Sequence, residues 1–226
     1  MRAATENIPI IKDALLKAGI VNKTLIDSIT AVIGKESNFR PQSENLNYSA
    51  KRIREVWPYI TPDQANKLQK NPVALGNFVY SNKYGNGPTQ GFLYRGRGFN
   101  QITFSNSYKK IGDQIGVDLL KNPDLLNNPT IAAKATAAFF KNVLAANKAK
   151  IKTIYGVDIT NIQPGTDPLK ILRIAVNANA GFNKPSNIVE TEYKKALQYF
   201  DYAQGKKNYF IPAIIAGLLL FLALKK

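Results

Sequence analysis

The clearest hydrophobic pattern in the first part of the chain predicts an amphipathic helix that ends near Glu36. Its apolar residues recur at helical spacing and are Leu25, Ile26, Ile29, Val32 and Ile33. Asn22 or Thr24 can cap its N-terminus, and Pro41 prevents the helix from continuing. The chain must therefore turn between Glu36 and Glu44, and a turn can bring Glu44 back across a groove.

The remaining patterns predict a mainly helical chain. Apolar periodicity with proline starts and glycine stops predicts helices at residues 10–18, 49–57, 62–70, 72–80, 105–115, from 129 onward, from 168 toward residue 181, and at 187–204. Residues 82–98 are rich in glycine and aromatic residues, which is typical of a loop or small hairpin lining a groove. Polar and apolar residues alternate along residues 99–104, which predicts a short strand or extended segment. Residues 145–165 are predicted to form an irregular connection.

The C-terminal residues 209–224 form an apolar run between two lysine pairs. As a helix this run extends about 24 Å, against a hydrocarbon core of roughly 30 Å, and the flanking lysines can snorkel. A buried core helix is the alternative, but a run that is apolar on every face is difficult to cover in a domain of this size. The pattern therefore predicts a domain at residues 1–205 and a membrane anchor at residues 206–226.

The amino-acid composition limits the groups that could carry out catalysis. The chain contains no histidine and no cysteine, which excludes Ser-His-Asp and Cys-His catalysis, zinc sites built on these residues, and disulfides. Catalysis must rest on carboxylates, lysine, tyrosine, hydroxyls or backbone groups, and we expect no metal and no cofactor. The formal net charge of +16 favours anionic partners. Because the basic residues are scattered and no recognition motif accompanies them, we expect cell-wall polymers or a membrane surface rather than nucleic acid.

Glu36 and Glu44 are the candidate pair for acid–base chemistry. A carboxylate at a helix C-terminus faces the negative end of the helix dipole, and Phe39 can desolvate it further. Both effects raise a pKa toward the value that a general acid needs. Glu55 is the nearest alternative to Glu44, but the flanking arginines favour a surface ion pair for Glu55. Solvated surface positions are the alternative for Glu36 and Glu44 themselves.

Three stretches of the chain resemble glycoside hydrolase family 19 as it occurs in bacteriophage endolysins and class I chitinases. They are E-S-N-F…E-N-L-N-Y-S-A from Glu36, F-V-Y-S-N-K-Y-G-N-G from Phe78, and Y-R-G-R-G-F-N-Q-I-T-F-S-N-S-Y from Tyr94. The resemblance covers roughly residues 10–200. It implies a mainly α, two-lobed, lysozyme-like domain with a small β hairpin or loop region and a deep cleft. It also implies hydrolysis, with inversion, of β-1,4 bonds between N-acetylated amino sugars.

The resemblance also implies roles for particular residues. Glu36 takes the place of the family's general acid and Glu44 that of its base. The residues expected to hold the N-acetyl and hydroxyl groups of the sugar are Tyr48, Gln101, Thr103 and Asn177, the last matching the asparagine of the family's V-N-G-G segment.

The chain departs from the family pattern at three places. Lys35 replaces the usual histidine, Asn38-Phe39 replaces Gly-Gly, and Ser107 replaces an asparagine that would contact the sugar. Since an ammonium turned toward Glu36 would lower the pKa of the acid, we expect Lys35 to point away from it.

Together these observations predict a peptidoglycan-degrading glycosidase, anchored through residues 209–224 in a virion membrane or a host inner membrane and acting on the cell wall. A phage protein used for entry or lysis fits this combination. Two alternatives remain open. The segment E-S-N-F-R-P also resembles the lytic transglycosylases, which would use Glu36 alone, although their G-L-M-Q segment is missing. The other alternative is a non-catalytic wall-binding virion protein.

Overall fold

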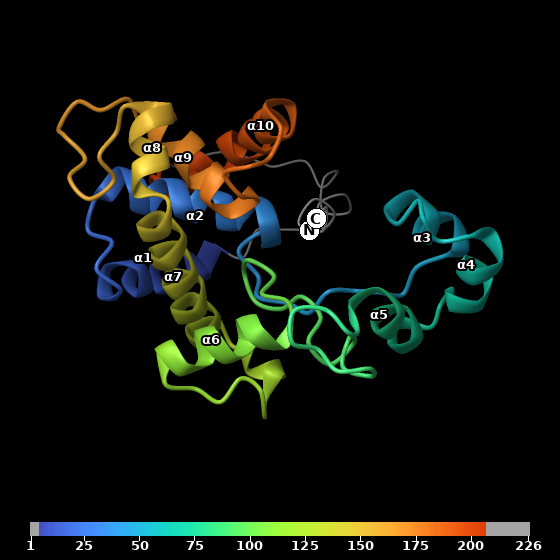
Figure 1. The fold of residues 1–226 in the computed structure, drawn as a ribbon. Helices are drawn as coiled ribbons and strands as arrows, with labels where there is room; N and C mark the ends of the chain where they lie inside the picture. The colour runs from blue at the N-terminus through green and yellow to red at the C-terminus, as the bar shows by residue number, and fades with distance from the viewer. Residues whose placement is uncertain (1–4, 207–226) are drawn as a thin grey trace.

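The computed structural model describes residues 5–206, and these residues form helices joined by loops (Figure 1). In chain order the helices are η1 (Thr5–Asn7), α1 (Ile8–Lys17), α2 (Lys23–Ser37), α3 (Ala50–Val56), α4 (Pro62–Leu68), α5 (Pro72–Tyr80), α6 (Ser105–Ile115), η2 (Pro123–Asn127), α7 (Pro129–Ala146), α8 (Lys148–Tyr155), α9 (Pro168–Ala180) and α10 (Ser186–Ala203). The predicted mainly helical class is confirmed.

Helix α2 lies at the centre of the larger group of helices. Helices α1, α9 and α10 all pack against it, and α7 packs against α1 and α9. The apolar side of α2 is buried in the largest hydrophobic core, where Ile29, Val32 and Ile33 are fully covered. Helix α2 is therefore covered on several sides, and its C-terminal end carries Glu36 into this packing.

Helices α3, α4 and α5 form a second group that Figure 1 shows standing apart from the α2 group. They have their own core, which includes Leu46, Trp57 and Leu75. Extended chain after α2 and the loops before α6 connect the two groups (Figure 1). A third core around Tyr108 and Leu126 lies where α6 packs against α7.

The helix ends follow the capping signals in the sequence. Of the two candidates for capping α2, Asn22 is the one used, and its side-chain oxygen accepts a hydrogen bond from the Leu25 N–H at 3.0 Å. At α4, Thr61 and Gln64 form the reciprocal capping box that the sequence predicted. These local contacts explain why helix starts could be read from the sequence.

The predicted strand at residues 99–104 is wrong. Among residues 5–206 the only β pairing is an isolated bridge between Arg97 and Ile102, and no strand or β hairpin is present. The backbone explains this, because Gln101 and Phe104 adopt φ angles of 54° and 72°, which an extended strand cannot accommodate. Residues 145–165 also differ from expectation, since they include α8.

The predicted transmembrane helix is also corrected. Within residues 5–206 no helix is both long enough and apolar enough to cross a membrane. The longest helices, α7 and α10, carry polar and charged residues such as Lys141 and Glu192, as amphipathic helices of a globular core do. The run at 209–224 lies outside the described residues. Membrane anchoring and a membrane location are therefore not supported.

Gly91 sets how closely the glycine-rich loop approaches α5. A Cβ at Gly91 would lie 2.3 Å from the Gly76 carbonyl oxygen and 2.8 Å from the Asn77 Cα, both backbone atoms of the helix. The Phe92 N–H next to it donates to the Asn77 side chain at 2.9 Å. The loop can lie against α5 only because residue 91 has no side chain.

We expect Gly91→Ala to destabilise the protein by about 1–3 kcal/mol, because the backbone of α5 must shift to admit a methyl group. Gly87→Ala is the matched control in the same loop, since its Cβ would meet only the flexible Gln90 side chain at 3.3 Å. Urea unfolding of both variants measures the difference. Equal unfolding midpoints for Gly91→Ala and the wild type would contradict this account of the contact.

Candidate active site

Glu36 lies in the last turn of α2, as predicted. Asn38 and Phe39 follow with left-handed φ angles of 53° and 60°, and they end the helix. Phe39 turns into the core and packs edge-on against Tyr199 of α10, with ring centroids 5.7 Å apart. A Cβ at Gly34 would lie 2.6 Å from the Phe39 ring and 2.5 Å from the Tyr199 ring. Glycine at 34 thus allows both rings to close over the end of α2.

Two donors hold the Glu36 carboxylate. Asn179 of α9 donates its Nδ2 to Glu36 Oε1 at 2.7 Å, and the Lys35 ammonium contacts the same oxygen. Lys35 also donates to Glu192 Oε2 of α10 at 2.6 Å. The expectation that Lys35 points away from Glu36 is wrong. The Lys35 side chain is only 3% exposed and lies between the carboxylates of Glu36 and Glu192. A buried ammonium needs such counter-ions, because an unpaired buried charge is unfavourable.

Glu44 lies on the extended chain between α2 and α3, where this chain pairs with the loop before α6. The Glu44 N–H donates to the Gly96 carbonyl at 2.8 Å, and the Gly96 N–H donates back to Glu44 Oε2 at 3.3 Å. The Tyr80 hydroxyl of α5 donates to Glu44 Oε1 at 2.8 Å. Glu44 is only 5% exposed, so its carboxyl is a buried group held by neutral donors.

Burial dominates the ionisation of Glu44. It raises the pKa of Glu44 to about 7, although the hydrogen bonds from Tyr80 and Gly96 act in the opposite direction. Burial, followed by the nearby charge of Glu44, also raises the pKa of Tyr80 well above its ordinary value, so Tyr80 remains a donor. A carboxyl that titrates near neutral pH in this way is a candidate for acid–base chemistry.

Gln101 and Thr103 gather beside Gly96. A Cβ at Gly96 would lie 2.8 Å from Gln101 Oε1 and 3.4 Å from Thr103 Oγ1, so the group needs glycine at this position. Gln101 Nε2 donates to the carbonyls of Gln42 and Gly98, at 3.0 Å in each case. Its Oε1 is buried and has no hydrogen-bond partner among the described residues. The amide of Gln101 thus fastens the loop to the chain that carries Glu44.

Tyr48 belongs to the same neighbourhood. Burial raises its pKa, and the charge of Glu44 adds to the effect. Its ring packs against Trp57, with centroids 6.1 Å apart. The charge of Glu44 thus acts on Tyr48, and Gln101 and Thr103 lie beside Gly96, the residue that bonds Glu44.

Asn177 has a different environment. Its Nδ2 donates to the Tyr155 hydroxyl of α8, and its backbone carbonyl accepts the Gly181 N–H at 2.8 Å. The side chain of α9 that reaches Glu36 is Asn179, two residues later. Sequence reasoning missed Asn179, although the run N-A-N-A offers both amides. It also missed Tyr80 and Glu192, whose roles depend on contacts far apart in the chain.

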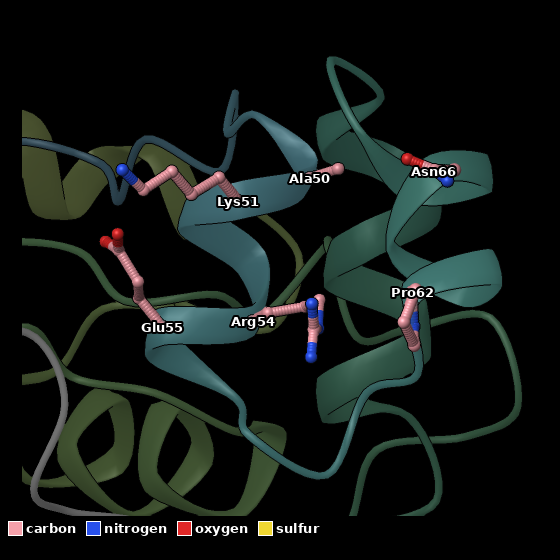
Figure 2. Close-up of a pocket in the computed structure, with 6 residues that line it drawn as sticks. All are labelled: Ala50, Lys51, Arg54, Glu55, Pro62 and Asn66. Carbon is pink, nitrogen blue, oxygen red and sulfur yellow. The ribbon is translucent and has the colours of Figure 1, made fainter.

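A cavity of about 490 Å³ lies between α3 and α4 (Figure 2), and neither Glu36 nor Glu44 lines it. It is lined by Ala50, Lys51, Arg54, Glu55, Pro62 and Asn66. Glu55 pairs with Arg52 at 3.0 Å, which confirms the surface ion pair predicted for it. Within residues 5–206, no acidic side chains gather in threes that could hold a metal ion.

Comparison with known proteins identifies the family. Glycoside hydrolase family 19, described as class I chitinase, matches residues 58–196 of the chain. The chain belongs to this family and so to the glycoside hydrolases. The matched residues begin after Glu36 and Glu44, so these two glutamates rest on the sequence pattern and on the contacts described above.

Individual relatives agree with the family. A glycosyl hydrolase family 19 domain-containing protein of Haemophilus influenzae is 34% identical over 131 residues, covering 55% of this chain and 65% of that protein. Endochitinase 1 of Theobroma cacao is 49% identical over 51 residues, 22% of this chain and 16% of the plant protein. Chitinase 11 of Oryza sativa is 43% identical over 47 residues, 21% of this chain and 18% of the rice protein. The chain thus spans less than two thirds of the length of these relatives.

The raised pKa of Glu44 predicts a pH-dependent stability. The unfolded chain ionises Glu44 from about pH 4.5, whereas the folded protein keeps the proton until about pH 7, so the stability contributed by the neutral carboxyl is lost as pH rises through this window. We expect Glu44→Gln, which stays neutral, to gain up to about 3 kcal/mol relative to the wild type between pH 4.5 and pH 8.

Urea unfolding at several pH values measures this difference. Glu55→Gln is the control, because Glu55 is exposed in its ion pair with Arg52. Parallel pH dependence in Glu44→Gln and the wild type would show that Glu44 titrates as an ordinary surface carboxylate.

Proposed function

We propose that the chain hydrolyses β-1,4 bonds between N-acetylated amino sugars, with Glu36 and Glu44 as the reacting carboxyl groups. Membership of glycoside hydrolase family 19 supports the reaction class. The observation that carries the assignment to this site is the environment of Glu44. It is a buried carboxyl with a pKa of about 7 that accepts hydrogen bonds from the Tyr80 hydroxyl and the Gly96 N–H, and Gln101 and Thr103 lie beside Gly96.

The two glutamates have different partners, which suits different roles. Glu36 donates a proton to the glycosidic oxygen, and its carboxylate is then stabilised by Asn179 and Lys35. Glu44 accepts a proton from the attacking water, a task suited to a carboxyl that titrates near neutral pH. Attack by water on the face opposite the leaving group inverts the configuration at the anomeric carbon.

The groups near Glu44 provide the means to hold a sugar. Thr103 and Tyr48 carry hydroxyls that can bond the N-acetyl and hydroxyl groups of a substrate. Gln101 acts mainly through position, since its amide nitrogen already binds the carbonyls of Gln42 and Gly98. Asn177 supports α9, and through it Asn179, by its contact with Tyr155.

Peptidoglycan is the proposed natural polymer. The formal net charge of +16 attracts anionic cell-wall polymers and keeps the enzyme near its substrate. Chitin, the polymer after which the plant relatives endochitinase 1 and chitinase 11 are named, has the same linkage between N-acetylated sugars but is uncharged. On peptidoglycan the activity would open a bacterial cell wall, as a phage lysin does.

We expect Glu36→Gln and Glu44→Gln each to lower the rate of glycan cleavage by at least about 100-fold, because each removes one proton-transfer group. Purified sacculi and chitin oligosaccharides are incubated with each variant, and the products are followed by mass spectrometry and by NMR of the newly formed anomer. Glu55→Gln is the matched control and retains activity.

The products separate the possible outcomes. New reducing ends formed first as the α anomer support the two-carboxylate mechanism. Ends of the 1,6-anhydro type, with activity that survives in Glu44→Gln, would assign a transglycosylase that uses Glu36 alone. Binding to sacculi without any release of fragments would overturn the enzymatic proposal.

A further inference from the structure

Four charged side chains form a chain of ion pairs that begins at Glu36 and has two buried members, Lys35 and Glu192, at its centre. The Lys35 ammonium contacts Glu36 Oε1 and lies 2.6 Å from Glu192 Oε2, and Glu192 Oε1 lies 3.0 Å from the Lys195 ammonium. Lys35 and Glu192 are 3% and 8% exposed at their side chains, whereas Lys195 is 20% exposed and lies nearer to solvent. Charges of opposite sign thus alternate from the proposed acid toward the surface of α10.

The helices around α2 contribute different groups to this region. Helix α10 provides Glu192 and, through it, Lys195. Helix α9 provides the neutral amide of Asn179, while its Arg173 pairs with Glu190. Helix α1 provides Lys12, which pairs with Asp27 nearer to the start of α2.

A proton donor beside a buried ammonium presents a physical difficulty. Glu36 must carry a proton before it reacts, and a neutral Glu36 no longer balances the charge of Lys35. Leaving a buried charge without a counter-ion is unfavourable, so Lys35 would oppose protonation of Glu36 if it had no other partner.

Glu192 supplies that other partner. Burial acts to lower the pKa of Lys35, but the charges of Glu36 and Glu192 outweigh it, and the pKa is raised. Burial acts to raise the pKa of Glu192, but Lys35 and Lys195 outweigh it, and the pKa is lowered. Lys35 and Glu192 therefore both carry their charges beside the ionised Glu36, and the 2.6 Å contact with Glu192 is the one that remains to the Lys35 ammonium when Glu36 is neutral.

We propose that Lys35 and Glu192 are positioning residues for Glu36: Glu192 binds the Lys35 ammonium while Glu36 is protonated, and the ammonium binds Glu36 once its proton has left. The proton goes to the glycosidic oxygen, and Lys35 keeps its own protons throughout. The inference rests on the proposed function, because it concerns the same Glu36 in the same reaction.

The test titrates Glu36 directly by NMR of the ¹³C-labelled glutamate carboxyl groups in the full chain, with Glu36→Gln used to assign the signal. Glu192→Gln leaves Lys35 with Glu36 alone, so the midpoint for Glu36 shifts to lower pH by about one unit. Lys195→Gln removes a cation that holds Glu192, so Glu192 draws Lys35 more strongly and the midpoint shifts the other way. The pH profile of kcat/KM on sacculi shifts in the same direction as each midpoint.

Glu190→Gln is the matched control. It removes the same charge from the same helix, but its partner Arg173 lies outside the cluster, so the Glu36 titration is unchanged. Equal midpoints in Glu192→Gln and Glu190→Gln would overturn the proposal. If Glu192→Gln does not fold, the variant Lys195→Gln decides, because Lys195 is less buried, and an unmoved midpoint there also overturns the proposal. Undiminished cleavage by Glu36→Gln would instead refute the proposed function, and the titration remains readable in that case.

Discussion

The position of Glu44 depends on one short pairing between distant parts of the chain. Residues 42–44 lie along residues 96–98, joined by the Glu44–Gly96 backbone bond at 2.8 Å and by the amide of Gln101 on the Gln42 carbonyl at 3.0 Å. Without this pairing the carboxyl of Glu44 would lie in solvent, where its ionisation would be ordinary. The pairing works because Gly96 has no side chain and Gln101 accepts a left-handed φ of 54°.

The two glutamates illustrate how one residue type acquires two environments. Glu44 accepts hydrogen bonds from uncharged donors, and burial raises its pKa more than these bonds and the nearby Arg95 charge lower it. Glu36 lies at a helix end beside an ammonium that is shared with Glu192. A polar backbone loop shapes the first environment, and the packing of α9 and α10 against α2 shapes the second. In the proposed mechanism, this difference in surroundings, rather than the residue type, separates the proton donor from the proton acceptor.

Local signals in the sequence predicted the helices well, because caps such as Asn22 and the Thr61–Gln64 pair act within one turn. The strand at 99–104 was mispredicted, because the alternation of polar and apolar residues does not reveal the positive φ angles of Gln101 and Phe104. Both glutamates could be singled out by their place relative to Pro41. The burial of Lys35 and its bond to Glu192 could not, because they depend on contacts across 157 positions of sequence.

The same long-range contacts determine when the helices around α2 can finish folding during protein synthesis. Helix α2 is synthesised early, but Asn179, the partner of Glu36, follows 143 positions later. Lys12 of α1 donates to the Ala203 carbonyl, which follows 191 positions later. Contacts within α3, α4 and α5 are local by comparison, so this group can fold while the chain is still being made. The apolar face of α2 lacks two of its packing partners until α9 and α10 have been synthesised. A nascent chain therefore carries both glutamates long before it can hold them in place.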